Sequence, residues 1–72
     1  MEYSVVLFQS ATRALQAEKR LRGKGIAAKL IPVPQQLSSS CGVCLRIPRE
    51  DESEIQKALE EERIEFQGIR AI

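Results

Sequence analysis

The sequence predicts an α+β fold in which two helices cover one face of a four-stranded antiparallel sheet. Strand-like and helix-like segments follow one another in the order βαββαβ, which is the order of the ferredoxin-like split βαβ sandwich. In that arrangement the first and third strands are central. A chain of 72 residues has room for one hydrophobic core, so we expect residues 1–72 to form a single domain.

The first half of the chain is predicted to form a strand, a helix and a strand. Residues 3–8 are β-branched and aromatic, with apolar side chains on both sides of the alternation, which is typical of a central strand. Ser10 can cap the helix that follows, and Gly23 and Gly25 can end it after a basic last turn. Residues 26–34 form the second predicted strand, whose two prolines place its end at a sheet edge. The expected inward stripe of the helix is Ala11, Ala14, Leu15 and Leu21.

The second half is predicted to form a strand, a helix and a strand. Apolar and polar side chains alternate over residues 43–47, which indicates the third strand. Asp51 is expected to cap the second helix, with Glu54 placed to complete a capping box. The last strand is expected over residues 64–72, with Gly68 as a candidate bulge.

Composition excludes several classes of protein. The hydrophobic fraction of 43% and the charged fraction of 29% are typical of a soluble globular domain. The net charge of +1 argues against a nucleic-acid-binding arm or a polybasic membrane surface. No apolar run is long enough to span a bilayer, and no signal peptide precedes the first strand. We therefore expect a cytoplasmic protein with no membrane or nucleic-acid partner.

Both cysteines lie within residues 38–47, between the second and third strands. The chain has no histidine and no tryptophan, so any bond-making chemistry must use a thiol of this segment. The topology places the loop before the third strand at the same sheet end as Ser10 and the start of the first helix. The exposed N–H groups of a helix N-terminus favour an anion by roughly 0.3–1 kcal/mol. Cys41 is therefore the predicted reactive thiolate.

Neighbouring residues are candidates to assist Cys41. Ser39 and Ser40 offer hydroxyl and N–H groups to a sulfur anion, although the serine run is also typical of a plain loop. Arg13 can turn its side chain back toward the sulfur, or remain a solvated helix residue. Gly42 lets the backbone bend beside the sulfur. The candidate binding residues are Ser10, Arg13, Ser39, Ser40 and Gly42.

Cys44 is expected to be a strand residue that points, with Arg46, to the sheet face opposite the helices. Cysteines three residues apart in a straight strand lie about 10 Å apart at their Cα atoms, whereas a disulfide needs about 7 Å or less. The pair closes only if residues 42–43 form a turn. Cys44 is thus a candidate resolving thiol, and inert packing is the alternative.

Two other functions remain open from the residues alone. Zinc needs four ligands, which two cysteines without histidine cannot supply, so we predict no metal site and no cofactor. A copper(I) chaperone using Cys41 and Cys44 is an alternative, although heavy-metal domains of this fold carry their cysteines after the first strand. The other alternative is an interaction or homodimerisation module, for which apolar residues on both faces of the first strand, including Val6 and Phe8, would mark an uncovered sheet face.

Four segments of the chain resemble the small selenium/sulfur carrier-like proteins, in the right order and across nearly the whole length. They are residues 3–10, 14–19, 30–34 and 38–42. Pro-x-Pro followed by Ser-Ser-x-Cys-Gly is the most specific part. The second cysteine is not a fixed part of that pattern.

The resemblance implies that the cysteine before the glycine, Cys41, holds sulfur or selenium as a persulfide or selenosulfide. It also implies two protein partners, a donor such as a cysteine desulfurase and an acceptor. Such a protein is a relay rather than a self-sufficient enzyme. No residue of the chain distinguishes sulfur from selenium.

Overall fold

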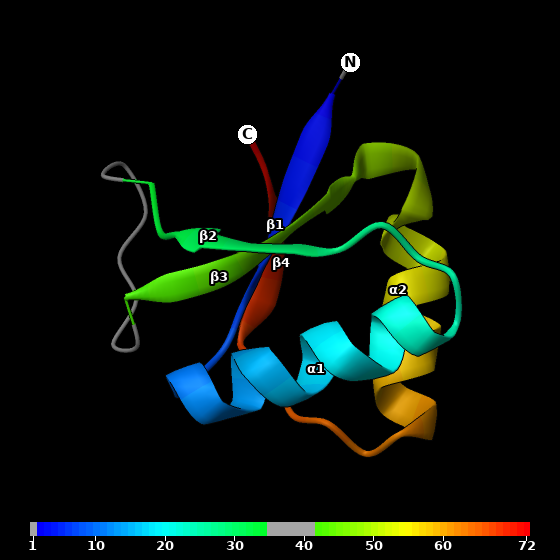
Figure 1. Ribbon diagram of the computed structural model, residues 1–72. Coiled ribbons are helices and arrows are strands. Elements are labelled where there is room, and N and C mark those ends of the chain that lie inside the picture. The colour runs from blue at the N-terminus through cyan, green and yellow to red at the C-terminus, as the bar shows by residue number, and fades with distance from the viewer. Residues whose placement is uncertain (1, 35–41) are drawn as a thin grey trace.

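The computed structural model describes residues 2–34 and 42–72 (Figure 1). Within them the four strands form one antiparallel sheet in the order β2-β3-β1-β4. The predicted α+β fold is confirmed, as is the central position of the first and third strands. The elements are β1 (Tyr3–Leu7), α1 (Ala11–Gly23), β2 (Lys29–Pro32), β3 (Val43–Pro48), a 3₁₀ turn (Arg49–Asp51), α2 (Glu52–Glu61) and β4 (Gly68–Ala71).

Both helices pack on the same face of the sheet, because alternate side chains of each strand point toward them. Val6 of β1, Phe8 just after it and Leu45 of β3 contribute to this main core. Small side chains of α1 let its backbone approach the strands. The buried helix residues are Ala14, Ala17 and Leu21 of α1 and Ile55, Ala58 and Leu59 of α2.

The opposite sheet face carries a second, smaller cluster. Val5, Leu7 and Cys44 are buried there, and Ile31 and Val33 pack against them. The prediction that Val6 and Phe8 mark an uncovered face was wrong, since both point toward the helices. The alternation of β1 gives the opposite face to its odd-numbered residues instead.

The ends of α1 follow the prediction. The side chain of extended Ser10 accepts a hydrogen bond from the backbone N–H of Arg13 at 3.3 Å, which confirms the N-cap. At the other end Gly25 has φ 81, and its N–H donates to the Arg22 carbonyl at 3.0 Å. The N–H of Ile26 reaches back to Leu21 in the bond that defines a Schellman motif.

The inward stripe of α1 differs from the prediction. Ala17 is buried, whereas Ala11 is exposed and Leu15 is 44% exposed. Ala17 is three residues from Ala14 and four from Leu21, so it shares their face of the helix. Leu15 is turned about 100° from Ala14, which carries it past the contact with the sheet.

Four predicted details differ from the structure. Strand pairing in β2 and β4 covers four residues each, so residues 26–28 and 64–67 lie outside the paired strands. Asp51 has φ −95 and ψ 4 and makes no capping hydrogen bond, since it closes the 3₁₀ turn that precedes α2. Gly68 pairs regularly with Leu7 and is not a bulge.

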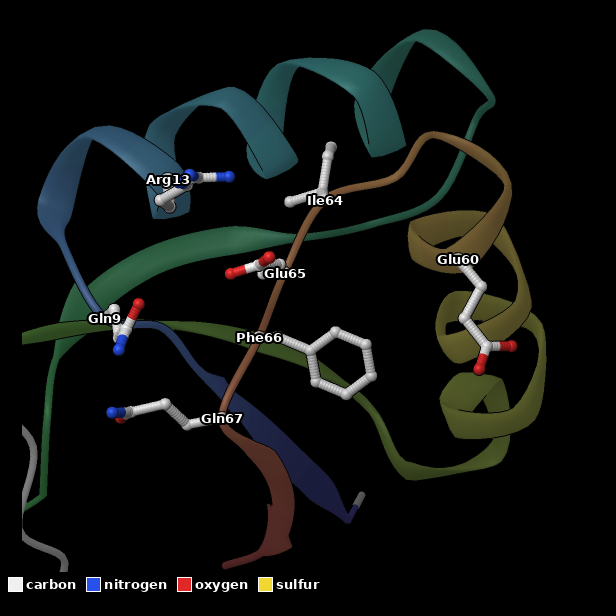
Figure 2. Close-up of a pocket in the computed structure, with 7 residues that line it drawn as sticks. All are labelled: Gln9, Arg13, Glu60, Ile64, Glu65, Phe66 and Gln67. Carbon is white, nitrogen blue, oxygen red and sulfur yellow. The ribbon is translucent and has the colours of Figure 1, made fainter.

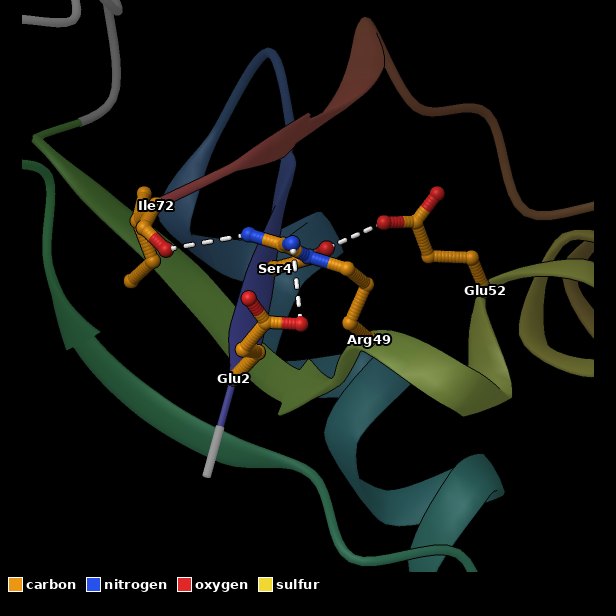
Figure 3. A network of polar contacts seen from close by, with 5 residues as sticks. All are labelled: Glu2, Ser4, Arg49, Glu52 and Ile72. Atoms are coloured by element: carbon orange, nitrogen blue, oxygen red, sulfur yellow. Dashed lines mark hydrogen bonds and ion pairs between the residues drawn. The ribbon is translucent and has the colours of Figure 1, made fainter.

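Polar contacts tie the helices and chain ends to the sheet. The hydroxyl of Ser4, which is fully buried in β1, donates to the carboxylate of Glu52 at the start of α2 (Figure 3). Arg49 bridges the Glu2 carboxylate at 3.1 Å and the Ile72 carbonyl at 3.4 Å.

A further polar contact lies at the β2 edge. The Glu18 carboxylate of α1 accepts from the backbone N–H of Leu30 at 3.1 Å. It thereby satisfies a donor of β2 that the sheet leaves unpaired.

Candidate functional site

The predicted site divides into residues that the structure describes and residues that it does not. Cys41, Ser39 and Ser40 lie outside the described residues, so their predicted roles stay predictions. Gly42, Cys44, Ser10 and Arg13 are described and can be placed. They belong to β3, the residue before it, and the N-terminal part of α1.

Gly42 lies where the chain enters β3. Its φ of 76 falls in the left-handed region, where any side chain would strain the backbone. Its carbonyl accepts from the N–H of Val33 at 3.1 Å, one step beyond the last register pair of β2 and β3, Pro32 and Val43. The residue following Cys41 therefore has the bent backbone that the sequence predicted.

Cys44 points to the sheet face opposite the helices, as predicted, and its side chain is fully buried there. In register it lies between Leu7 of β1 and Ile31 of β2. Its sulfur contacts the carbonyl of Pro32 at 4.0 Å. A thiol with no exposed surface needs local opening of the sheet before a reagent or a second sulfur can reach it.

Ser10 is engaged in the helix cap, because its side-chain oxygen already accepts the Arg13 N–H. The Arg13 side chain extends over a hollow of about 420 Å³ between α1 and the segment that links α2 to β4 (Figure 2). Figure 2 shows it directed toward Ile64. The predicted turn of Arg13 toward Cys41 remains a prediction, since Cys41 is not described.

This hollow has an apolar floor and a polar rim. Ile64 and Phe66 pack partly buried against the main core and form the floor. The rim consists of Gln9, Arg13, Glu60, Glu65 and Gln67. The Gln67 N–H donates to the Leu7 carbonyl at 2.6 Å, so the hollow opens beside the end of β1. The sequence does not indicate this hollow, because its pattern predicts a strand over residues 64–67.

Metal and membrane features can be stated for the described ranges. No group of three or more Cys, Asp or Glu side chains within residues 2–34 and 42–72 could hold a metal ion. Nor does any helix in those ranges have the length and apolar character required to cross a bilayer.

Comparison with known proteins gives one match. A family model described as "Putative Se/S carrier protein-like" matches residues 2–70. Searches of curated proteins and of solved structures returned no significant match. The family match spans nearly the whole chain, including the Gly42 turn and the buried strand that carries Cys44. The protein belongs to the Se/S carrier-like family, as the resemblance of its four segments implied.

Proposed function

We propose that this protein carries sulfur or selenium on Cys41 and relays it from a donor protein to an acceptor. The match to the Se/S carrier-like family over residues 2–70 carries the proposal. The burial of Cys44 supports the choice of residue. The chain has two cysteines, and the sulfur of Cys44 has no exposed surface.

The loading step is a thiol exchange at the outer sulfur of a donor persulfide. The Cys41 thiolate attacks that sulfur, a new S–S bond forms to Cys41, and the S–S bond of the donor breaks. The bonding pair leaves with the inner sulfur of the donor as a thiolate, and the outer sulfur keeps its proton. The product is Cys41–S–SH, or the selenium analogue when the donor carries selenium.

Delivery repeats the same exchange. A thiolate of the acceptor attacks the outer atom on Cys41 and releases the Cys41 thiolate for another cycle. Neither step changes the total oxidation state, so no cofactor, oxidant or reductant is required. Cys44 is not needed, and its use as a resolving thiol would first require it to leave its buried position between β1 and β2.

Two described features support Cys41 as a site of exchange. The bent backbone at Gly42 adjoins it in the chain, and small residues beside a reactive sulfur leave room for an incoming partner. Gly42 is itself exposed. Both features belong to Gly42, the residue next to Cys41. They support a thiol that is accessible to two other proteins.

The test is a loading assay with a cysteine desulfurase, isotopically labelled cysteine and intact-mass detection. Wild type and Cys44→Ala are expected to gain one sulfur atom, about 32 Da, and Cys41→Ser is expected to gain none. Cys44→Ala serves as the matched control, because it removes a thiol and leaves the 38–42 segment intact. An adduct that persists on Cys41→Ser would overturn the assignment.

The alternatives predict different results in the same set of variants. A copper(I) chaperone would bind copper(I) tightly as wild type and would lose that binding in both Cys41→Ser and Cys44→Ala. An interaction module keeps its partner binding in Cys41→Ser and shows no adduct in any variant. Of the three functions, the carrier is the one that requires Cys41 and does not require Cys44.

A further inference from the structure

Three basic residues lie in one row across the sheet. Lys29 of β2 is opposite Arg46 of β3, Arg46 is opposite Val5 of β1, and Val5 is opposite Arg70 of β4. Val5 belongs to the cluster on the face away from the helices, so the whole row belongs to that face. Neighbouring strands lie about 4.8 Å apart, which puts the Cα atoms of the three basic residues within about 15 Å of one another.

None of these three cations makes an ion pair with another described residue. The ion pairs within residues 2–34 and 42–72 use Arg20, Lys24 and Arg49. Lys29 and Arg70 are exposed. Arg46 is half-buried, with its guanidinium 4.4 Å from the centre of the Tyr3 ring and its Nε buried without a hydrogen-bond partner.

Without a bound anion, the row of like charges lowers the stability of the sheet. Like charges directly opposite each other on neighbouring strands, as Lys29 and Arg46 are, destabilise the pair. The strands β1 to β4 contribute no carboxylate to this face. A protein of net charge +1 therefore places three unpaired cations together, while much of its acidic charge lies on and around α2. An external anion would relieve the repulsion.

A hollow of about 730 Å³ continues the row past the edge strand β2. Tyr3, Lys29 and Arg46 line it, together with Arg22 of α1. The one carboxylate in its lining belongs to Glu18, which already accepts the Leu30 N–H. The basic surface thus crosses the whole sheet and extends past β2 to Arg22, where it forms a hollow.

We propose that this row is the docking surface for an acidic segment of a partner protein, whose carboxylates meet Lys29, Arg46 and Arg70. The proposal rests on the proposed function, in which the partner is the sulfur or selenium donor or acceptor. Arg46 is four residues from Gly42 along the chain, about 13 Å in extended backbone, so a docked partner would lie near the end of β3 that follows Cys41 in the sequence.

An acidic protein fits this surface better than a nucleic acid does. Tyr3 is the one aromatic side chain that the described strands contribute to this face, and Arg46 already stacks on its ring. No further ring is presented there for a base to stack on. Half-buried Ile31 and Val33, beside the row, offer contacts to apolar side chains.

The test is a titration of ¹⁵N-labelled protein, followed by backbone amide shifts at low salt, with oligoglutamate peptide as the probe. Shifts are expected at Lys29, Arg46 and Arg70. The double variant Lys29→Glu/Arg70→Glu is expected to bind about tenfold more weakly. The control Lys19→Glu/Lys57→Glu makes the same change in net charge on the exposed helix surfaces and is expected to bind as wild type does.

Three outcomes would overturn the proposal. They are shifts confined to α1, equal weakening in both double variants, or tighter binding at the row by an oligouridylate of matched charge. The last would make this face a nucleic-acid site. The amide spectrum of each variant reports whether it is folded. Because the titration uses no thiol, its failure leaves the Cys41 loading assay unaffected, and a failed loading assay leaves the titration unaffected.

Discussion

The backbone N–H of Ile64 donates to the carbonyl oxygen of Leu59 at 2.9 Å, which closes the end of α2 in a Schellman motif. Arg63 lies inside that turn with φ 57, in the left-handed region. The helix α1 ends in the same motif, with Gly25 at the equivalent position and φ 81. The two helices thus solve the same geometric problem with residues of very different conformational cost.

Replacing Arg63 by glycine is expected to stabilise the protein. The left-handed conformation strains an arginine but not a glycine, so Arg63→Gly should raise the free energy of unfolding by about 0.5–1 kcal/mol. Arg63 forms no ion pair with a described residue that would be lost. Urea unfolding measures the change, and Arg63→Ala, which keeps the strain, is the control. A loss of stability in Arg63→Gly would contradict the strain argument.

The two glycines at the end of α1 are expected to respond in opposite directions. Gly23→Ala should raise the free energy of unfolding by about 0.5–1 kcal/mol, because Gly23 is helical and an added Cβ meets nothing within 4 Å. Gly25→Ala should lower it by about 1 kcal/mol, since alanine is strained at φ 81. Thermal unfolding of the two variants in parallel is the measurement. If both variants shifted the unfolding temperature in the same direction, the backbone conformation at the end of α1 would not explain their stability.

Removing the Ser4 hydroxyl is expected to loosen α2 from the sheet. Ser4→Ala should lower the free energy of unfolding by about 1–2 kcal/mol, since the hydroxyl is buried and donates to a carboxylate. Ser53→Ala, an exposed serine one residue beyond Glu52, should change stability by less than about 0.5 kcal/mol. Chemical denaturation compares the two. An equal effect would mean that the Ser4–Glu52 contact contributes nothing particular.

The Cys44 thiol is expected to be protected in the native protein. In Cys41→Ser, alkylation of Cys44 should be at least about a hundredfold slower than in denaturant, because its sulfur reacts only when the sheet opens. Intact mass after timed quenching gives the rate. A native rate close to the denatured rate would restore Cys44 as a candidate resolving thiol.

Local sequence signals predicted the parts of the fold that local geometry controls. Ser10 caps α1 through a bond three residues away, and Gly25 ends it through its own φ. The alternation of apolar and polar residues in β3 correctly predicted that Cys44 points to the face opposite the helices. Each of these depends on residues within a few positions of one another, so the sequence pattern is sufficient.

The sequence could not predict features that depend on distant partners. Asp51 is a residue type that favours a helix N-cap, which led to the prediction. In the structure the chain instead enters α2 through a 3₁₀ turn that directly follows β3. The ends of β2 and β4 depend on where their neighbours stop pairing. The basic row could not be predicted for the same reason, because Lys29, Arg46 and Arg70 fall in one row only when all four strands are in register.

The contact between Glu18 and Leu30 has a consequence for how this protein avoids self-association. Successive N–H groups of a strand point to alternate sides, so Leu30 and Pro32 share the outer edge of β2. The Leu30 N–H is taken by Glu18, proline has none, and the N–H of Ala28 is taken by the Ile26 carbonyl. An incoming strand from another chain would find no donor along that edge. Pairing through the N–H groups of this edge is therefore disfavoured, which is how soluble proteins protect an edge strand.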